Sequence, residues 1–246
     1  LLMYDLEIEY QNYSQAGEDG IIEHMLNALH TPNKICVEMG WGNDVKGAIH
    51  GHAINCTQNL IQNHSYKGYA FDLKKQANIP ANVSFFREAV VPQNTNSYIE
   101  RFGKDVDFFS LDIDSYDFVI MYSLLEAGFR PKTMCVETNR IMGYDYEFSF
   151  PYMQQGVFDK KILHGVSLKK YQTYLGSKGY KFFTLCTSGL NAFFYKPECV
   201  DENKLTKDVI HTVDRVRDRS MSKEQYCKML KEHPYWKKYI NEEMFI

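Results

Sequence analysis

Acidic residues follow two apolar runs in the middle of the chain. Asp112 and Asp114 end the run Val106–Asp114, and Glu137 and Asn139 end the next one. If these runs are neighbouring parallel strands, Asp112 and Glu137 come within reach of each other. Clustered carboxylates suit a hard divalent cation such as Mg²⁺, and a carboxylate with a raised pKa can take a proton from a hydroxyl. We therefore expect Asp112 and Glu137 to be catalytic, and Asp112, Asp114 and Glu137 to be candidate metal ligands.

Two alternatives accompany this interpretation. Asp114 or Ser115 could instead cap the helix that follows, because short polar side chains accept hydrogen bonds from the first turn of a helix. His164, which precedes Gly165 and a later helical segment, is an alternative catalytic base because histidine titrates near neutral pH.

A glycine-rich turn follows an earlier apolar run. Glu38 closes that run, and Gly40 and Gly42 come directly after it. Glycines let a backbone approach a ligand closely, and in open α/β sheets ligands bind at the carboxyl ends of the strands. Asp72 ends the next apolar run, where a carboxylate can accept both ribose hydroxyls. Position 45 is Val45, so the phosphate-binding Gly-x-Gly-x-x-Gly pattern is not met, and we expect an adenosine-containing cofactor without a pyrophosphate.

The elements that must position these residues alternate along the chain. Short continuous apolar runs predict buried parallel strands, and the helical segments between them predict a doubly wound α/β fold. Strands are expected at Lys34–Gly40, Lys67–Leu73, Val83–Val91, Val106–Asp114, 133–138, Tyr180–Thr187 and Leu190–Lys196, and helices at 47–63, 116–128 and 167–178, with a further helix before the first strand.

The last two strand runs are separated only by Ser188 and Gly189. A two-residue link of this kind predicts a hairpin. The sheet should therefore be mostly parallel and end in an antiparallel pair, which is the Rossmann-like sheet of methyltransferases and departs from ordinary dinucleotide-binding folds.

The composition limits the possible partners. The chain has 246 residues, 44% apolar residues and a net charge of −3, so we expect no nucleic acid or acidic membrane surface as a partner. Its six cysteines show no metal-binding spacing, which favours buried thiols and a cytoplasmic, reducing location. No run is long enough to span a membrane. The chain begins at Leu1, which leaves open whether it is part of a longer polypeptide.

The chain divides into two expected parts. Residues 1–200 carry the strands and the candidate site, and residues 201–246 are predicted to form a helical extension packed on that domain. Ser222 and Gln225 have the spacing of a capping box. A lid or a homodimer contact is the alternative role for this extension.

Several of these segments, taken in order, resemble the FkbM-type branch of S-adenosylmethionine-dependent methyltransferases. The resemblance spans roughly residues 14–196. It comprises Ser14-Gln15-Ala16-Gly17-Glu18-Asp19-Gly20, Val37-Glu38-Met39-Gly40, Ser110-Leu111-Asp112-Ile113-Asp114, Val136-Glu137-Thr138-Asn139 and Asn191-Ala192-Phe193-Phe194.

The resemblance implies roles for individual residues. S-adenosylmethionine would bind at the carboxyl edge of the sheet, with Glu38, Gly40 and Gly42 at its amino-acid end, Asp72 on its ribose and Ala89 near its adenine. Gln15 and Asp112 would also contact it. Family members typically methylate hydroxyls of sugars, glycans or natural products, so a small-molecule or glycan acceptor is implied. Trp41 and Ser115 depart from the family pattern and affect the shape of the acceptor pocket.

Three other functions account for part of the pattern. Asp112-Ile113-Asp114 resembles the Asp-x-Asp of haloacid-dehalogenase-type phosphatases, although Tyr116 stands where that family has Thr or Val. An NAD-dependent oxidoreductase would explain Gly40 and Asp72 but not the terminal hairpin. A non-catalytic module that binds the cofactor without turnover is the third alternative.

Overall fold

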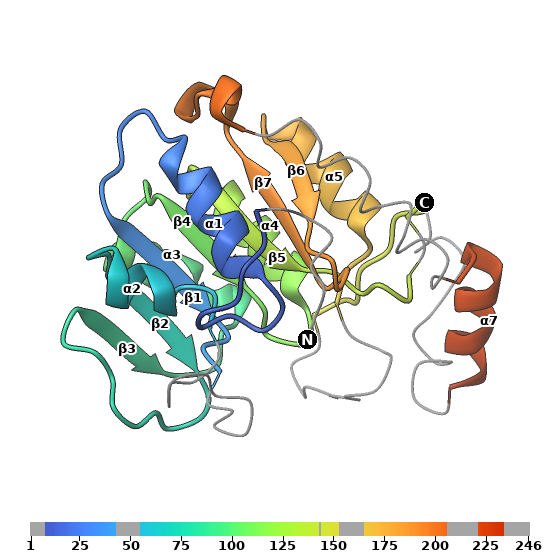
Figure 1. Cartoon of the computed structure of the whole chain (residues 1–246). Helices are drawn as coiled ribbons and strands as arrows, with labels where there is room; N and C mark the ends of the chain where they lie inside the picture. The colour runs from blue at the N-terminus through green and yellow to red at the C-terminus, as the bar shows by residue number, and fades with distance from the viewer. Residues whose placement is uncertain (1–7, 43–54, 143, 153–164, 206–220, 234–246) are drawn as a thin grey trace.

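The computed structural model describes residues 8–42, 55–142, 144–152, 165–205 and 221–233. A seven-stranded sheet forms its centre, with the order β3-β2-β1-β4-β5-β7-β6 (Figure 1). The strands are β1 (Ile35–Met39), β2 (Lys67–Asp72), β3 (Val83–Arg87), β4 (Phe108–Leu111), β5 (Thr133–Glu137), β6 (Lys181–Leu185) and β7 (Asn191–Tyr195).

The direction of β7 distinguishes this sheet from an all-parallel one. Strands β3, β2, β1, β4 and β5 pair in parallel, whereas β7 is antiparallel to both β5 and β6. The predicted fold class is therefore confirmed: an α/β, mostly parallel sheet with the antiparallel end of a methyltransferase sheet. The predicted hairpin is present, but its loop is longer than two residues, because Cys186 donates to the Asn191 carbonyl at 3.0 Å and closes the loop outside Ser188 and Gly189.

Helices cover both faces of the sheet. They are α1 (Glu18–Asn27), α2 (Gln58–Asn63), α3 (Thr95–Phe102), α4 (Asp117–Glu126), α5 (Leu168–Ser177) and α7 (Lys223–Glu232), and the short 3-10 helices are η2 (Pro92–Asn94), η3 (Pro197–Cys199) and η4 (Glu202–Lys204). Helices α1 and α2 pack with Cys36, Phe108 and Cys135 on one face. Helices α3, α4 and α5 pack with Val37, Phe109 and Val136 on the other.

The strand register places the chemically interesting residues on one of these faces. Glu38 pairs with Ser110, and Ser110 pairs with Cys135, so these side chains form a row on the α1 and α2 face. Side chains alternate along a strand. Asp112 and Glu137, each two positions further, therefore continue this row at the carboxyl edge.

Some element boundaries differ from those expected. The strand predicted at Val83–Val91 ends at Arg87, because the chain then turns so that Tyr98 can bond the backbone at Ala89 and Val91. Of the helix predicted at 47–63, residues 58–63 form α2, and residues 43–54 lie outside the described residues. Helix α3 was not predicted.

Helix α7 packs against the segment between β5 and α5. Tyr226 and Leu230 form a cluster with Met142, Phe148 and Phe150. The predicted capping box is confirmed, since Ser222 and Gln225 each bond the other's backbone N–H. The division of the chain at residue 200 stays a prediction.

Three of the cysteines behave as the strand patterns indicated. Cys36, Cys135 and Cys186 are buried, and all six thiols are free. Within the described ranges, no helix is both long enough and apolar enough to cross a membrane.

Candidate functional site

Three carboxylates meet where β4 and β5 end. Each of Asp112, Asp114 and Glu137 offers an oxygen, and these oxygens lie within 4.8 Å of one another. Burial raises the pKa of Asp112 well above its usual range, and the charge of Glu137 adds to the shift. Burial likewise raises the pKa of Glu137, with the charge of Asp117 adding to it. This arrangement favours a shared proton or a bound cation, because either one removes the repulsion.

The loop that carries Asp114 is organised by Asp117. The Asp117 carboxylate accepts the backbone N–H of Ile113 at 2.8 Å and that of Ser115 at 3.0 Å. Asp114 has a positive φ of 56° and is not a helix cap. The N-cap of α4 is Tyr116, which makes no side-chain capping bond, so the alternative role of Asp114 or Ser115 as a cap was wrong. The side chain that accepts hydrogen bonds from this loop is instead that of Asp117, the first residue of the helix.

A buried tyrosine lies close enough to these carboxylates to be affected by their charge. The Tyr171 hydroxyl of α5 is inaccessible to solvent and has no hydrogen-bond partner among the described residues. Its pKa is raised well above the usual range, first by burial and then by the charges of Asp117, Glu137 and Asp112. No strand-end pattern signals this residue, because it lies on a helix far along the sequence.

The segment before α5 contacts the loop that carries Asp114 and Ser115. Gly165 donates its N–H to the Ser115 carbonyl at 3.1 Å, and Asn139 donates to the Val166 carbonyl at 2.9 Å. His164, the alternative base, lies outside the described residues.

Gly40 is required by a close backbone approach. Its φ is +97°, and a Cβ at this position would lie 1.5 Å from the Asp112 carbonyl oxygen. The Gly40 and Trp41 N–H groups both donate to the Phe71 carbonyl, at 2.9 and 3.0 Å. The turn at Gly40 and Gly42 is thereby held over the ends of β2 and β4. Gly42 is the last described residue before position 55 and is half-buried.

Glu38 is buried beneath this turn. Its carboxylate accepts the N–H groups of Cys56 and Thr57, each at 2.9 Å, and the Thr57 hydroxyl. Burial raises the pKa of Glu38 to about 7, although these hydrogen bonds oppose the shift. The structure thus places Glu38 where it fixes the chain segment that leads into α2.

The opening segment folds around the start of α1. Asp19 accepts the N–H groups of Asn12, Tyr13 and Ser14 at 2.7–2.8 Å. Glu18 accepts from Ala16 at 2.6 Å and from the Asn191 side chain at 2.9 Å. The Gln15 side chain is exposed. The acids of this segment are therefore buried at the helix N-terminus, where the helix dipole favours negative charge.

A separate group lies at the ends of β2 and β3. Asp72 is half-buried, accepts the Lys74 N–H at 2.6 Å and has a pKa raised by burial. Leu73 beside it is 67% exposed, and Ala89 is also exposed. An exposed apolar side chain next to a strand-end acid is a candidate ligand contact that sequence reasoning missed. The signal was present, because Leu73 directly follows Asp72.

Trp41, which follows Gly40, packs against β3. Its ring packs on Phe85 with centroids 5.8 Å apart, and its carbonyl accepts from Gln76 at 2.9 Å. The indole N–H is buried without a hydrogen-bond partner among the residues described.

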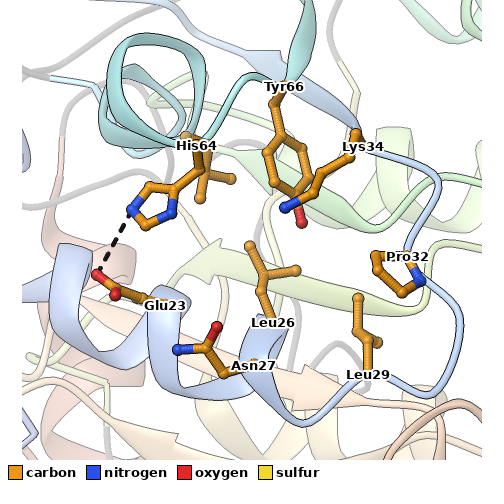
Figure 2. Close-up of a pocket in the computed structure, with 9 residues that line it drawn as sticks. Glu23, Leu26, Asn27, Leu29, Pro32, Lys34, His64 and Tyr66 are labelled. Atoms are coloured by element: carbon orange, nitrogen blue, oxygen red, sulfur yellow. Dashed lines mark ion pairs between the residues drawn. The ribbon is translucent and has the colours of Figure 1, made fainter.

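A small cavity opens at the opposite edge of the sheet, and Figure 2 shows the residues that line it. It has a volume of about 190 Å³ and lies between the ends of α1 and α2, beside Lys34, His64 and Tyr66. Small-molecule sites usually occupy roughly 300–1,000 Å³. His64 and Glu23, which pair at 3.6 Å, are among the residues that line it, and none of the candidate site residues lines it. We therefore place the candidate site at the carboxyl edge.

The chain has distant structural relatives among solved proteins. No family model and no curated protein matches the sequence. The chain is similar to the MycE methyltransferase from the mycinamycin biosynthetic pathway, solved in complex with Mg, SAH and mycinamycin VI, with 12% identity and a TM-score of 0.46. The match covers 78% of this chain and 52% of that one, so the chain spans about half the length of that structure. A likeness at this level transfers no residue role, and the fold assignment rests on the strand order itself.

Proposed function

We propose that this chain is an S-adenosylmethionine-dependent methyltransferase that methylates an oxygen of a sugar, glycan or related small molecule. The observation that carries the proposal is the antiparallel strand β7 inserted between β5 and β6, in a sheet whose β1 ends in Glu38-Met39 and is followed directly by Gly40. The ordered segments that resemble the FkbM-type branch support the choice of an oxygen acceptor.

The residues at the carboxyl edge fit this cofactor. Gly40 and Gly42 would admit its amino-acid end above Glu38, and Asp72 would bind its ribose. Leu73 and Ala89, both exposed beside Asp72, would contact its adenine, and Gln15 would approach from the opening segment. Buried polar atoms without partners at Asp19, Trp41 and Asn55 are further support for a ligand here, since such atoms are nearly always hydrogen-bonded.

The chain's own contribution to the reaction is alignment and proton removal. The cofactor would supply a methyl group on a sulfonium, which is already a strong electrophile. Holding the acceptor oxygen in line with that carbon can contribute about 7–11 kcal/mol to lowering the barrier. Asp112 is the proposed base that takes the acceptor's proton, and Glu137 supports it by receiving or sharing that proton. General-base catalysis of this kind contributes roughly 10²–10⁴-fold.

The same carboxylates could instead bind a divalent cation. Asp112, Asp114 and Glu137 would hold Mg²⁺, which prefers oxygen ligands and keeps several waters. A cation bound there would lower the pKa of an acceptor hydroxyl and orient it. His164 then becomes the alternative base, because the carboxylates would be occupied.

The rival functions make different use of these residues. A phosphatase of the haloacid-dehalogenase type would need Asp112 as a nucleophile, and Tyr116 stands where that family has Thr or Val. A module that binds the cofactor without turnover would retain Gly40 and Asp72 but gain nothing from Asp112.

Fluorescence offers a direct test of the cofactor assignment. The chain has two tryptophans, so Trp236→Phe leaves Trp41 beside the glycine turn as the sole indole reporter. S-adenosylhomocysteine should shift its emission saturably. In that background Asp72→Asn should weaken binding about tenfold or more, because the charge-assisted hydrogen bonds to the ribose are lost. Asp105→Asn, the same change at the opposite edge, should leave affinity unchanged. Equal affinity in both variants would remove Asp72 from the site.

A further inference from the structure

Two buried side-chain oxygens at the carboxyl edge lack hydrogen-bond partners. They are Asp19 Oδ1 and Asn55 Oδ1, on side chains that are 1% and 4% exposed. Both residues otherwise make ordinary bonds: Asp19 through its other oxygen and Asn55 through its backbone N–H. Because buried acceptors are rarely left unpaired, the two oxygens indicate that a donor is missing from this part of the molecule.

Short connections place these two oxygens in the same locality. Tyr13 bonds to both residues, since its N–H donates to Asp19 at 2.7 Å and its carbonyl accepts the Asn55 N–H at 3.1 Å. Cys56, the next residue, donates to Glu38 at 2.9 Å. The charge of Asp19 is close enough to Glu38 to contribute to the raised pKa of that carboxyl. Asp19, Asn55 and Glu38 are therefore neighbours in space, and Glu38 lies two residues before Gly40.

The chemistry of this region calls for a cation that donates hydrogen bonds. Asp19 and Glu38 form no ion pair with any lysine, arginine or histidine that the structure describes. Neither carboxylate belongs to a three-residue group with metal-ligand spacing within the described ranges. A primary ammonium has three N–H donors and one positive charge. It would satisfy both unpaired oxygens and offset the two acids.

We propose that Asp19 and Asn55 bind the α-ammonium group of the cofactor's amino-acid end. This inference rests on the proposed function, because that function supplies the ligand carrying an ammonium. It adds two residues to the site, one from the start of α1 and one from the segment before α2. On this proposal the glycine turn only leaves space for the amino-acid end of the cofactor, and the side chains of Asp19 and Asn55 bind its positive charge.

The test compares ligands that differ only at this group. S-adenosylhomocysteine and its desamino analogue, in which hydrogen replaces the amine, are titrated calorimetrically into the wild type and variants. The wild type should prefer the amine-bearing ligand by about tenfold or more, as expected for charge-assisted hydrogen bonds. Asn55→Ala and Asp19→Asn should abolish that preference and leave affinity for 5′-methylthioadenosine, which lacks the whole amino-acid end, unchanged.

The controls separate binding from folding. Asn55→Asp keeps an acceptor and should retain the preference, and Asn63→Ala, an exposed asparagine at the far end of α2, should behave as the wild type. Four hydrogen bonds converge on the other oxygen of Asp19, so Asp19→Asn could fail to fold. In that case the comparison of Asn55→Ala with Asn55→Asp tests the proposal.

Each outcome bears on a different claim. If the wild type and all variants bind S-adenosylhomocysteine with the same preference over its desamino analogue, the ammonium site alone is overturned. Buried water would then satisfy the two oxygens. A wild type that binds none of the three ligands would overturn the proposed function, and the ammonium site with it.

Discussion

At the scale of single residues, burial of carboxyl groups is the dominant feature of the candidate site. Glu38, Asp112 and Glu137 all have raised pKa values, and burial is the leading cause in each case. The sequence could predict which acids end strands. It could not predict that Glu38 would bond Thr57, because that contact depends on how residues 55–57 return to the sheet. It also could not reveal Tyr171, whose closeness to Asp112 arises only from packing.

The raised pKa of Glu38 predicts a specific pH dependence of stability. Its pKa rises from 4.5 to about 7 on folding, so the folded state binds this proton more tightly than the unfolded state. The contribution of Glu38 to the free energy of unfolding should therefore be fully present below pH 4.5, fall as the pH rises to about 7 and be lost above it. This loss should be at most about 3.5 kcal/mol, at ~1.4 kcal/mol per pKa unit.

Urea unfolding of Glu38→Gln beside the wild type isolates this effect. The decline between pH 4.5 and about 7 should be smaller in the variant than in the wild type, because only the contribution of Glu38 is removed. The same decline in both proteins would mean that Glu38 does not titrate in this range.

The acidic group predicts a magnesium-dependent stabilisation. Glu137→Gln removes one of the repelling charges, so the variant without metal should unfold about 2–4 °C higher, which corresponds to roughly 1 kcal/mol. It should also lose the stabilisation that Mg²⁺ gives the wild type, since only binding to the folded state raises the melting temperature. Differential scanning calorimetry with and without Mg²⁺ measures both effects. Glu198→Gln is the matched control, and a magnesium response equal in all three proteins would argue against the site.

At the scale of elements, the carboxyl ends of the strands are held together by backbone contacts. The turn after β1 bonds the end of β2, and the Asp112 N–H donates to the Met39 carbonyl at 2.9 Å. The apolar runs predicted the strands because buried parallel strands need them. Helix α3 was missed because its buried residues, Tyr98, Ile99 and Phe102, are few and are spread over little more than one turn.

Gly40→Ala should be severely destabilising. The added Cβ would meet the Asp112 carbonyl at 1.5 Å, and φ is +97°. Gly103→Ala is a matched control, since Gly103 also has a positive φ of 87° but has no atom within 4 Å of an added Cβ. The control should cost about 1–2 kcal/mol through backbone strain alone. Gly40→Ala should cost at least about 3 kcal/mol more in urea unfolding. Similar losses in the two variants would show that β1 and β4 do not approach closely at Gly40.

At the scale of the whole molecule, the amino and carboxyl edges of the sheet differ in how their charged groups are paired. The amino edge is stabilised by a buried ion pair between Lys132 and Asp107, 2.9 Å apart. Asp107 also accepts the N–H groups of Asn33 and Lys34. The carboxyl edge carries the unpaired polar atoms and the repelling acids. Burying such groups lowers stability, and sites that bind ligands commonly bear this cost.

Helix α7 should contribute to stability through Tyr226. This side chain is fully buried, and its ring lies 5.8 Å from that of Phe148 and 6.4 Å from that of Tyr146. Tyr226→Ala should cost about 3–5 kcal/mol, whereas Lys228→Ala on the exposed side of the helix should change stability by less than about 0.5 kcal/mol. Chemical unfolding followed by circular dichroism distinguishes these values. Equal, small effects would mean that α7 does not stabilise the fold.

The central claim is that this fold binds S-adenosylmethionine. The most direct measurement is a calorimetric titration of the wild-type chain with S-adenosylhomocysteine, repeated with NAD⁺. We expect saturable one-to-one binding of S-adenosylhomocysteine and no heat of binding with NAD⁺. Absence of binding to S-adenosylhomocysteine, with or without Mg²⁺, would contradict the claim.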